Sequence, residues 1–174
     1  MSETERVRER ERPPLGDNPY ERIMRQRKEL AERNLTGPVV IRGEDRQWYQ
    51  TRQGKLRYYL DPVTFKDTPL QHWRVFIHDI RTRSGKHRHQ GGQVMMILEG
   101  QGYTLIDGVK HPWKAGDVVN LPLRADGIIV QHFNTDPAQP ARFVAAEPNW
   151  LDCTSVDRGC GFEQLEDAPE YRKE

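Results

Sequence analysis

Residues 84–93 have the sequence Ser-Gly-Lys-His-Arg-His-Gln-Gly-Gly-Gln, and they say more about the architecture than any other part of the chain. His87 and His89 are two residues apart, so in an extended segment both imidazoles project from one face. The Gly91-Gly92 pair favours a turn, because glycine takes positive φ at little steric cost. Such a turn brings Gln93 back beside the two histidines. The pattern predicts a cluster of polar side chains on one face of a β structure.

On both sides of this stretch, short segments rich in Val, Ile, Tyr and Trp alternate with Gly, Asp and Pro. Such segments favour strands, and pairs such as Asp107-Gly108 favour the tight turns of hairpins. Many short strands joined in this way are typical of an all-β sandwich or barrel. The expected strands are 39–42, 47–52, 56–60, 71–80, 93–98, 103–107, 117–121, 128–132 and 141–146.

The chain divides by composition into four parts. Alternating Arg and Glu at the N-terminus predict a disordered arm. Asn18 followed by Pro19 is a helix-start pattern, because Asn caps free amides and Pro suits the first helical position; the helix is expected to reach about Arg33 and to pack outside the barrel. The expected boundaries are a charged arm at 1–16, an N-terminal helix at 17–36, a β-barrel at 37–148 and an acidic C-terminal tail at 149–174.

Charge and hydropathy exclude several functional classes. Lys and Arg number 27 against 26 acidic residues, a formal charge of +1, which argues against nucleic-acid binding. The longest apolar run, 94–98, is far shorter than the roughly 20 residues that span a membrane. The N-terminus shows no signal-type apolar stretch, so we expect a cytoplasmic protein. Cys153 and Cys160 are too few for a disulfide scaffold or a zinc pair, and are expected to be free thiols.

Two ordered blocks of residues resemble the two motifs of the cupin superfamily. The resemblance covers 84–148 closely and implies an antiparallel β-barrel, or jelly roll, that holds a metal ion among inward-facing side chains. It also implies a second copy of the chain as a partner, because cupins often form homodimers through their sheets. The first block is His87, His89, Gln93 and Gly100, and the second is Gly116, Pro122 and the segment 128–134.

The sequence departs from the cupin pattern at two positions. The first motif normally supplies a glutamate where this chain has Gln93, a neutral and weaker donor. The histidine of the second motif normally stands four residues before the closing asparagine, here Asn134, and that position is Val130. His132 has the same strand parity as Val130 and is our replacement ligand, offset by about 6–7 Å along the strand unless a bulge intervenes.

Three arrangements of this centre remain open. In the first, His87, His89 and His132 hold a divalent metal, with Gln93 as a fourth ligand or a hydrogen-bonding neighbour. Fe(II) is favoured, while Mn, Ni, Cu and Zn also suit imidazole ligands. In the second, His132 does not bind the metal and instead faces the substrate as a base. In the third, the barrel holds no metal, and the histidines are ordinary polar lining.

Other polar residues rank lower as functional candidates. His72 and His78 share a face of one expected strand, and structural or exposed roles are the simpler account for both. His111, before Pro112, indicates a surface turn. Arg57, Arg74 and Arg83 could present a guanidinium to a substrate carboxylate if they face the barrel interior. Met95 and Ile97 are expected inside, and Met96 and Leu98 against a second sheet or partner chain. The segment 163–174 is expected to be a solvated tail, or else to lie across the barrel or a neighbouring subunit.

The favoured function is a metal-dependent cupin oxidoreductase acting on a small organic acid or phenolic compound. The resemblance extends distantly to gentisate dioxygenases, whose iron is held by histidines without a carboxylate, so an Fe(II) dioxygenase is expected, with Gln93 and His132 contributing to catalysis. A metal-assisted isomerase, decarboxylase or lyase is an alternative. A non-catalytic barrel that binds a small molecule is the other.

Overall fold

The computed structural model describes residues 18–148 and 162–172, so the expected N-terminal arm and both cysteines lie outside the described residues. The chain forms two compact units. One contains the helix and the segment 67–69, and the other contains the β structure. Nothing in the described ranges forms a helix with the length and apolarity needed to cross a membrane.

The helical unit is built on α2 (Pro19–Thr36), three residues longer than the sequence predicts. The Asn18 side chain accepts a hydrogen bond from the backbone N–H of Tyr20, and Pro19 occupies the first turn. These are the two start signals seen in the sequence. At the other end, the Gly37 N–H donates to the Arg33 carbonyl at 2.8 Å. Packing of α2 against the barrel stays a prediction.

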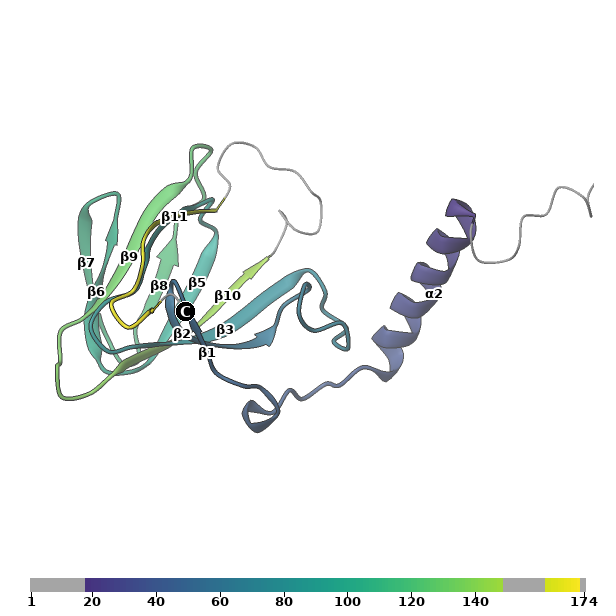
Figure 1. The fold of residues 1–174 in the computed structure, drawn as a ribbon, viewed down its shortest axis with the longest axis horizontal. Coiled ribbons are helices and arrows are strands. Elements are labelled where there is room, and N and C mark those ends of the chain that lie inside the picture. The colour runs from purple at the N-terminus through teal and green to yellow at the C-terminus, as the bar shows by residue number, and fades with distance from the viewer. Residues whose placement is uncertain (1–17, 149–161, 173–174) are drawn as a thin grey trace, which may run out of the picture. The chain divides into compact units, whose positions relative to one another are not determined.

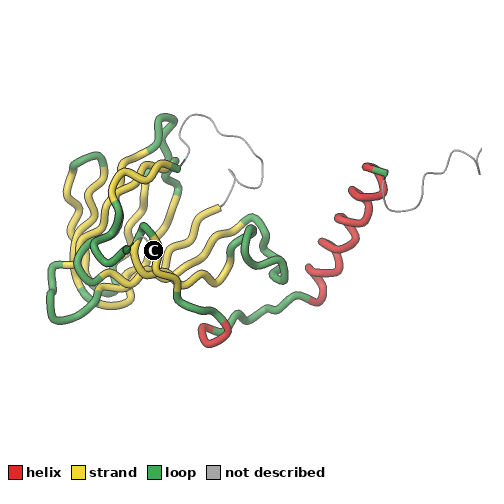
Figure 2. Tube along the Cα trace, in the orientation of Figure 1, coloured by secondary structure: helices red, strands yellow, loops and turns green. Residues whose placement is uncertain are grey.

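The β unit consists of two antiparallel sheets (Figures 1 and 2). The six-stranded sheet has the order β1-β2-β3-β10-β5-β8, and the five-stranded sheet has the order β11-β4-β9-β6-β7. A single 3-10 turn, η1 (Gly43–Asp45), precedes the first strand. The strands are β1 (Tyr49–Thr51), β2 (Gly54–Leu60), β3 (Trp73–Ile80), β4 (Lys86–His89), β5 (Gln93–Glu99), β6 (Gln101–Ile106), β7 (Val109–Lys114), β8 (Val118–Leu121), β9 (Ile128–Asn134), β10 (Ala141–Pro148) and β11 (Glu163–Glu166).

Strand alternation sets what lies between the sheets. On β5, Gln93, Met95 and Ile97 are buried, while the residues between them are exposed. From β10, Phe143 enters the same core, and Val130 enters from β9 in the other sheet. Because period-2 alternation places every second residue on one face, one hydrophobic core fills the space between the sheets. Met95 and Ile97 therefore face inward, as expected from the sequence.

Three expectations about local structure are wrong. The segment 39–42 forms no strand, since its valines are exposed and unpaired with any sheet. His111 lies in β7, which pairs with β6, and its side chain is exposed. His72 precedes β3 rather than lying within it, so it does not share a strand face with His78. For the segment 163–174, the alternative of contact with the barrel holds, because β11 pairs antiparallel with β4.

The outer face of the six-stranded sheet carries an apolar row across β10, β5 and β8. Val94 and Met96 of β5 are 49% and 48% exposed, and Val118 of β8, which pairs with Met96, is 55% exposed. On β10, Val144 continues the row, because it pairs with Met96 on one side and with Ile77 on the other. Exposed apolar side chains that lie side by side on neighbouring strands favour contact with another surface.

Candidate active site

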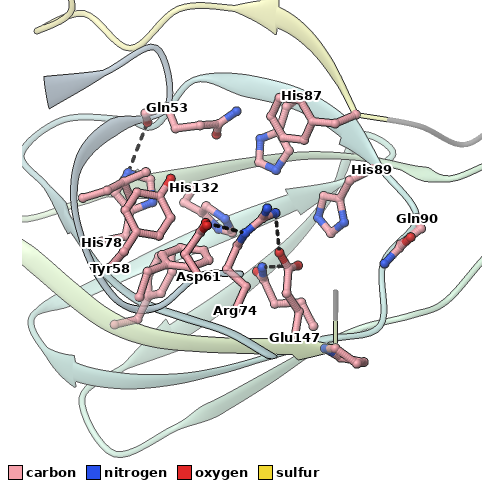
Figure 3. Close-up of a pocket in the computed structure, with 16 residues that line it drawn as sticks. Gln53, Tyr58, Asp61, Arg74, His78, His87, His89, Gln90, His132 and Glu147 are labelled. Atoms are coloured by element: carbon pink, nitrogen blue, oxygen red, sulfur yellow. Dashed lines mark hydrogen bonds and ion pairs between the residues drawn. The ribbon is translucent and has the colours of Figure 1, made fainter. Parts of the chain in front are cut away.

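A cavity of about 350 Å³ lies between the two sheets of the β unit (Figure 3). Polar residues from both sheets meet in it, together with the aromatic rings of Phe76, Phe143 and Phe162. Its polar lining consists of Gln53, Tyr58, Asp61, Arg74, His78, His87, His89, Gln90, Gln93, His132 and Glu147. All four residues of the predicted site, His87, His89, Gln93 and His132, therefore line one cavity.

Two pairs of histidine rings are in contact in the cavity. His87 and His89 of β4 stack with ring centroids 5.1 Å apart. His132 of β9 lies beside His78 of β3, with centroids 6.2 Å apart. The ladder between β4 and β9 pairs His87 with Val130 and has no bulge. His132 therefore lies two residues beyond Val130 along β9, as predicted. Its ring is beside the ring of His78.

Burial keeps all four imidazoles uncharged near neutral pH. Loss of hydration disfavours the imidazolium form, because an ion is poorly solvated inside the protein. Burial is the largest cause in each case and lowers the pKa of His87 to about 3 and the pKa values of His78 and His89 to about 4. Burial also lowers the pKa of His132 well below its usual value, and the neighbouring histidines add to this effect.

A guanidinium bound by two carboxylates forms the opposite wall. Arg74 of β3 and Glu147 of β10 are direct partners in the strand register. The Arg74 Nη1 lies 3.3 Å from the Glu147 Oε1, and its Nε lies 3.3 Å from the Asp61 Oδ2. The Gln93 amide nitrogen donates to the Glu147 Oε2 at 2.9 Å. Gln93 thus holds a carboxylate that enters the cavity from another strand.

Three ring nitrogens have defined hydrogen-bond partners. The backbone N–H of Gly91 donates to His89 Nδ1 at 2.9 Å. His132 Nδ1 lies 2.9 Å from the hydroxyl oxygen of Thr104, the residue opposite it on β6. His78 Nε2 lies 3.1 Å from the carbonyl oxygen of Gln53. Since a carbonyl only accepts, His78 carries its proton on Nε2.

The predicted ligand set is not gathered into a metal site in this structure. The rings of His87 and His89 stack on each other, with planes 14° apart. His132 has its Nδ1 against the Thr104 hydroxyl. Within 18–148 and 162–172, no group of three or more His, Cys, Asp or Glu side chains is placed to hold a metal. Metal binding here stays a prediction.

The arginine candidates have separate positions. Arg74 alone lines the cavity, and it is engaged by Asp61 and Glu147. The Arg57 guanidinium lies over the Trp48 ring, 4.4 Å from its centroid. Arg83 binds Glu166 of β11 at 3.1 Å. A substrate carboxylate would therefore meet one guanidinium that already binds two carboxylates.

Sequence reasoning missed Asp61, Tyr58 and Glu147 as cavity residues. Glu147 had a usable signal, because it shares strand parity with the buried Phe143 and Ala145. The expected strand ended one residue too early to include it. Asp61 follows β2 in a turn, where its Oδ1 accepts from the backbone N–H of Val63. Nothing in its local pattern indicates a direction into the barrel.

No protein-family model matches the chain, and no curated protein matches it. PAC13 of Streptomyces, described as a unique nucleoside dehydratase, is 11% identical, with a TM-score of 0.52 over 75% of this chain and 92% of PAC13. The polyketide cyclase RemF from Streptomyces resistomycificus is 16% identical, with a TM-score of 0.50 over 64% of this chain and 80% of RemF.

A cupin-like protein from Thermotoga maritima is 20% identical, with a TM-score of 0.48 over 76% of this chain and 92% of that protein. Identities this low show the fold and leave the activity to be argued from the cavity. The two antiparallel sheets around a polar interior agree with the architecture that the blocks at 84–93 and 116–134 resemble. The chain therefore shares the antiparallel β-barrel fold of PAC13 and RemF, which is the architecture that the resemblance to cupins implies.

Proposed function

We propose that the chain is a cupin enzyme that moves a proton on a small, uncharged ring compound bound between its sheets, as an isomerase or lyase does. The observation that carries this proposal is the carboxylate of Glu147, held in the cavity by hydrogen bonds from Arg74 and Gln93. A fixed carboxylate beside neutral hydrogen-bonding groups is suited to general acid–base catalysis.

The charge of the cavity favours an uncharged substrate. Among the described residues that line the cavity, Asp61 and Glu147 supply two negative charges, and Arg74 supplies one positive charge. The neutral imidazoles add none. An organic acid would bring a further negative charge into a partly desolvated space where the charge balance is already negative, and such repulsion is costly. The proposed substrate class therefore differs from the sequence prediction of an organic acid or phenol, because it leaves out organic acids and includes other uncharged rings.

The shape and lining of the cavity favour a single ring. Its volume of about 350 Å³ is at the small end of ligand pockets. Aromatic side chains from three elements, Phe76, Phe143 and Phe162, supply flat apolar surface. The amides and imidazoles supply directed hydrogen bonds for hydroxyl or carbonyl groups. A carbonyl-bearing or hydroxylated ring satisfies both kinds of lining.

The proposed step needs no second reactant. The Glu147 carboxylate takes a proton from the carbon next to a substrate carbonyl, and the electron pair of that C–H bond moves onto the carbonyl oxygen. Return of the proton to another carbon gives an isomer, and loss of a leaving group from the neighbouring carbon gives an elimination product. Arg74 and Gln93 fix the carboxylate through its two oxygens. Orientation of this kind contributes to rate through proximity.

Solvent exchange tests the step without knowledge of the natural substrate. Uncharged cyclic ketones, each matched with a carboxylated analogue of the same ring, are incubated with the protein in D₂O, and deuterium at the α-carbon is followed by NMR. We expect enzyme-dependent exchange for uncharged members and at least a tenfold loss in Glu147→Gln. Glu99→Gln, an exposed carboxylate of β5 on the outer face, should retain the exchange.

Binding without exchange would favour the non-catalytic small-molecule barrel. PAC13 is described as a nucleoside dehydratase and was solved with uridine, so uridine and uridine monophosphate form a further matched pair. Calorimetry on each pair reports the charge preference separately from turnover. Tighter binding of the charged members would contradict the proposed substrate class.

The Fe(II) dioxygenase is the second candidate. Two buried ring nitrogens, His87 Nδ1 and His89 Nε2, have no hydrogen-bond partner among the described residues, and an ion or a ligand would satisfy them. Oxygen uptake after anaerobic loading with ferrous iron, with hydroquinone and gentisate as substrates, tests this candidate. Uptake that is lost in His87→Ala/His89→Ala would establish it.

A further inference from the structure

The proton of His89 is located by its hydrogen bond to the chain. A peptide N–H can only donate, so the bond from Gly91 N–H requires a lone pair on His89 Nδ1. A neutral imidazole has one ring proton, which must then be on Nε2. This Nε2 is buried and has no partner among the described residues, and the His89 ring is directed into the cavity (Figure 3).

The proton of His132 is located by a chain of two hydrogen bonds. The Trp113 indole N–H donates to the Thr104 hydroxyl oxygen at 2.9 Å, and the same oxygen lies 2.9 Å from His132 Nδ1. Thr104 is fully buried, and its hydroxyl has no other acceptor in the described chain. The hydroxyl proton is satisfied only if it is donated to Nδ1. His132 then also carries its proton on Nε2.

We infer that His89 and His132 present two Nε2–H donors to the cavity, and that these donors bind the carbonyl oxygen of the substrate. This inference rests on the proposed function and names the substrate group that the site recognises. A donor pair attracts lone pairs and developing negative charge, and it repels a cation. Two of the three rings predicted to be metal ligands are thus oriented as an oxyanion-binding pair.

This role complements that of Glu147. When a proton leaves the carbon next to a carbonyl, negative charge accumulates on the oxygen, and pre-oriented N–H groups stabilise that charge most in the transition state. Neutral imidazoles donate without adding a formal charge, so they do not neutralise the carboxylate that acts as base. Glu147, on the six-stranded sheet, removes the proton. His89 and His132, on the five-stranded sheet, stabilise the electron pair that moves onto the substrate oxygen.

Thr104 is a positioning residue in this arrangement. It lies directly opposite His132 in the β6–β9 register, and Gly102, two residues earlier, lies opposite Trp113 of β7. A Cβ on Gly102 would lie 2.5 Å from the Trp113 ring, so only glycine lets the indole reach Thr104. Trp113 of β7 thus acts through Thr104 of β6 to fix the position of the ring proton of His132 on β9.

Side-chain ¹⁵N NMR of the ligand-free protein tests the two proton positions. Long-range ¹H–¹⁵N spectra distinguish a protonated from an unprotonated ring nitrogen, and His89→Gln and His132→Gln assign the signals. We expect a protonated Nε2 and a bare Nδ1 for both rings at neutral pH. A proton mainly on Nδ1 of either ring overturns the inference.

Variants of Thr104 test its positioning role. Thr104→Val removes the donor to Nδ1, and we expect the His132 signals to shift towards the Nδ1–H form while those of His89 stay unchanged. Thr104→Ser keeps a hydroxyl and should restore the wild-type pattern. An unchanged His132 pattern in Thr104→Val overturns the role. If the valine variant fails to fold, the serine variant and the wild-type spectrum still decide the proton positions.

Zinc separates this inference from a metal site. Addition of one equivalent of Zn²⁺ to the protein should leave the ¹⁵N signals of both rings unchanged, whereas a cation site would strip Nε2 of its proton and shift both rings. Because these spectra need no substrate, they are independent of the exchange assay. Correct proton positions without exchange would reject the proposed function alone, and exchange with Nδ1–H rings would reject this inference alone.

Discussion

His78 and His132 reach the cavity from opposite sheets and meet edge to face, with ring centroids 6.2 Å apart and planes at 85°. Burial lowers the pKa of His78 to about 4, whereas an exposed histidine in the unfolded chain titrates near 6.5. As the pH falls below about 6.5, the unfolded chain binds protons that the folded chain does not. The free energy of unfolding is therefore highest above that pH. It decreases progressively towards pH 4, by about 3 kcal/mol for His78 alone.

Denaturant unfolding near pH 7.5 and near pH 5 measures this loss. His78→Asn should reduce the difference between the two pH values, because it removes one group that must remain neutral in the fold. His111→Asn, an exposed histidine of β7, should leave the difference unchanged. Equal unfolding free energies at both pH values in the wild type would contradict the prediction.

Neutralising the two carboxylates should reverse the charge preference of the cavity. In Asp61→Asn/Glu147→Gln, Arg74 keeps its charge while both of its anionic partners are lost. An Asn side chain at position 61 retains the oxygen that accepts a hydrogen bond from the Val63 backbone N–H, so the turn after β2 is kept. We expect carboxylated ring compounds to gain about tenfold in affinity, or about 1.4 kcal/mol. Calorimetry on the matched pairs checks this, and an unchanged preference would mean that Arg74 does not face the ligand.

The metal content of the purified protein tests the ligand set predicted from the sequence. Elemental analysis of protein prepared without affinity tag or chelator is compared for wild type and His87→Ala/His89→Ala. The hydrogen bonds at His89 and His132 predict well below one equivalent of metal in both. One equivalent that is lost in the double variant would support the iron prediction and contradict the donor pair.

Gly102→Ala should be strongly destabilising for a steric reason. Its Cβ would lie 2.0 Å from the Phe133 carbonyl oxygen and 2.5 Å from the Trp113 ring. We expect a loss above about 3 kcal/mol, as for other overpacked core positions. Gly108→Ala is the matched control, since its Cβ meets nothing within 4 Å and only its positive φ of 84° opposes the change. A loss of about 1 kcal/mol is expected there, and equal losses at both sites would contradict the steric account.

The predicted homodimer should use the apolar outer face of the six-stranded sheet. Met96 of β5 lies on that face between Val118 of β8 and Val144 of β10. Met96→Lys should weaken a dimer by burying a charge, and light scattering coupled to gel filtration measures the mass. Val109→Lys, at an exposed position of the other sheet, is the control. A monomeric wild type would reject the dimer.

The fold could be predicted because its signals are local. The spacing of His87 and His89 and the alternation along 93–98 describe strands whose inner and outer faces the structure reproduces. The segment 39–42 shows the limit of such evidence, because β-branched residues favour a strand only where a partner strand exists. Strand β11 shows the opposite case, since its acidic sequence gives no strand signal and its pairing with β4 supplies one.

The sequence predicted which residues line the candidate site, but not which of their rings lie side by side. His87, His89, Gln93 and His132 do line one cavity, as their parity indicates. Which ring lies beside which depends on the stacking of two sheets, and no local pattern encodes that contact. The partner of His132, Thr104, lies 28 residues earlier in the chain and is apparent only from the strand register.

The pairing of β11 with β4 makes the C-terminal region a support for the site. Gln53 donates its amide to Gln164 of β11 and offers its carbonyl to His78, so one residue connects the last strand with a cavity imidazole. The same strand covers an edge of β4 that would otherwise present unpaired peptide groups. Shortening the chain before Glu163 would therefore remove no candidate catalytic residue, yet it would free an aggregation-prone edge and release the anchor of His78.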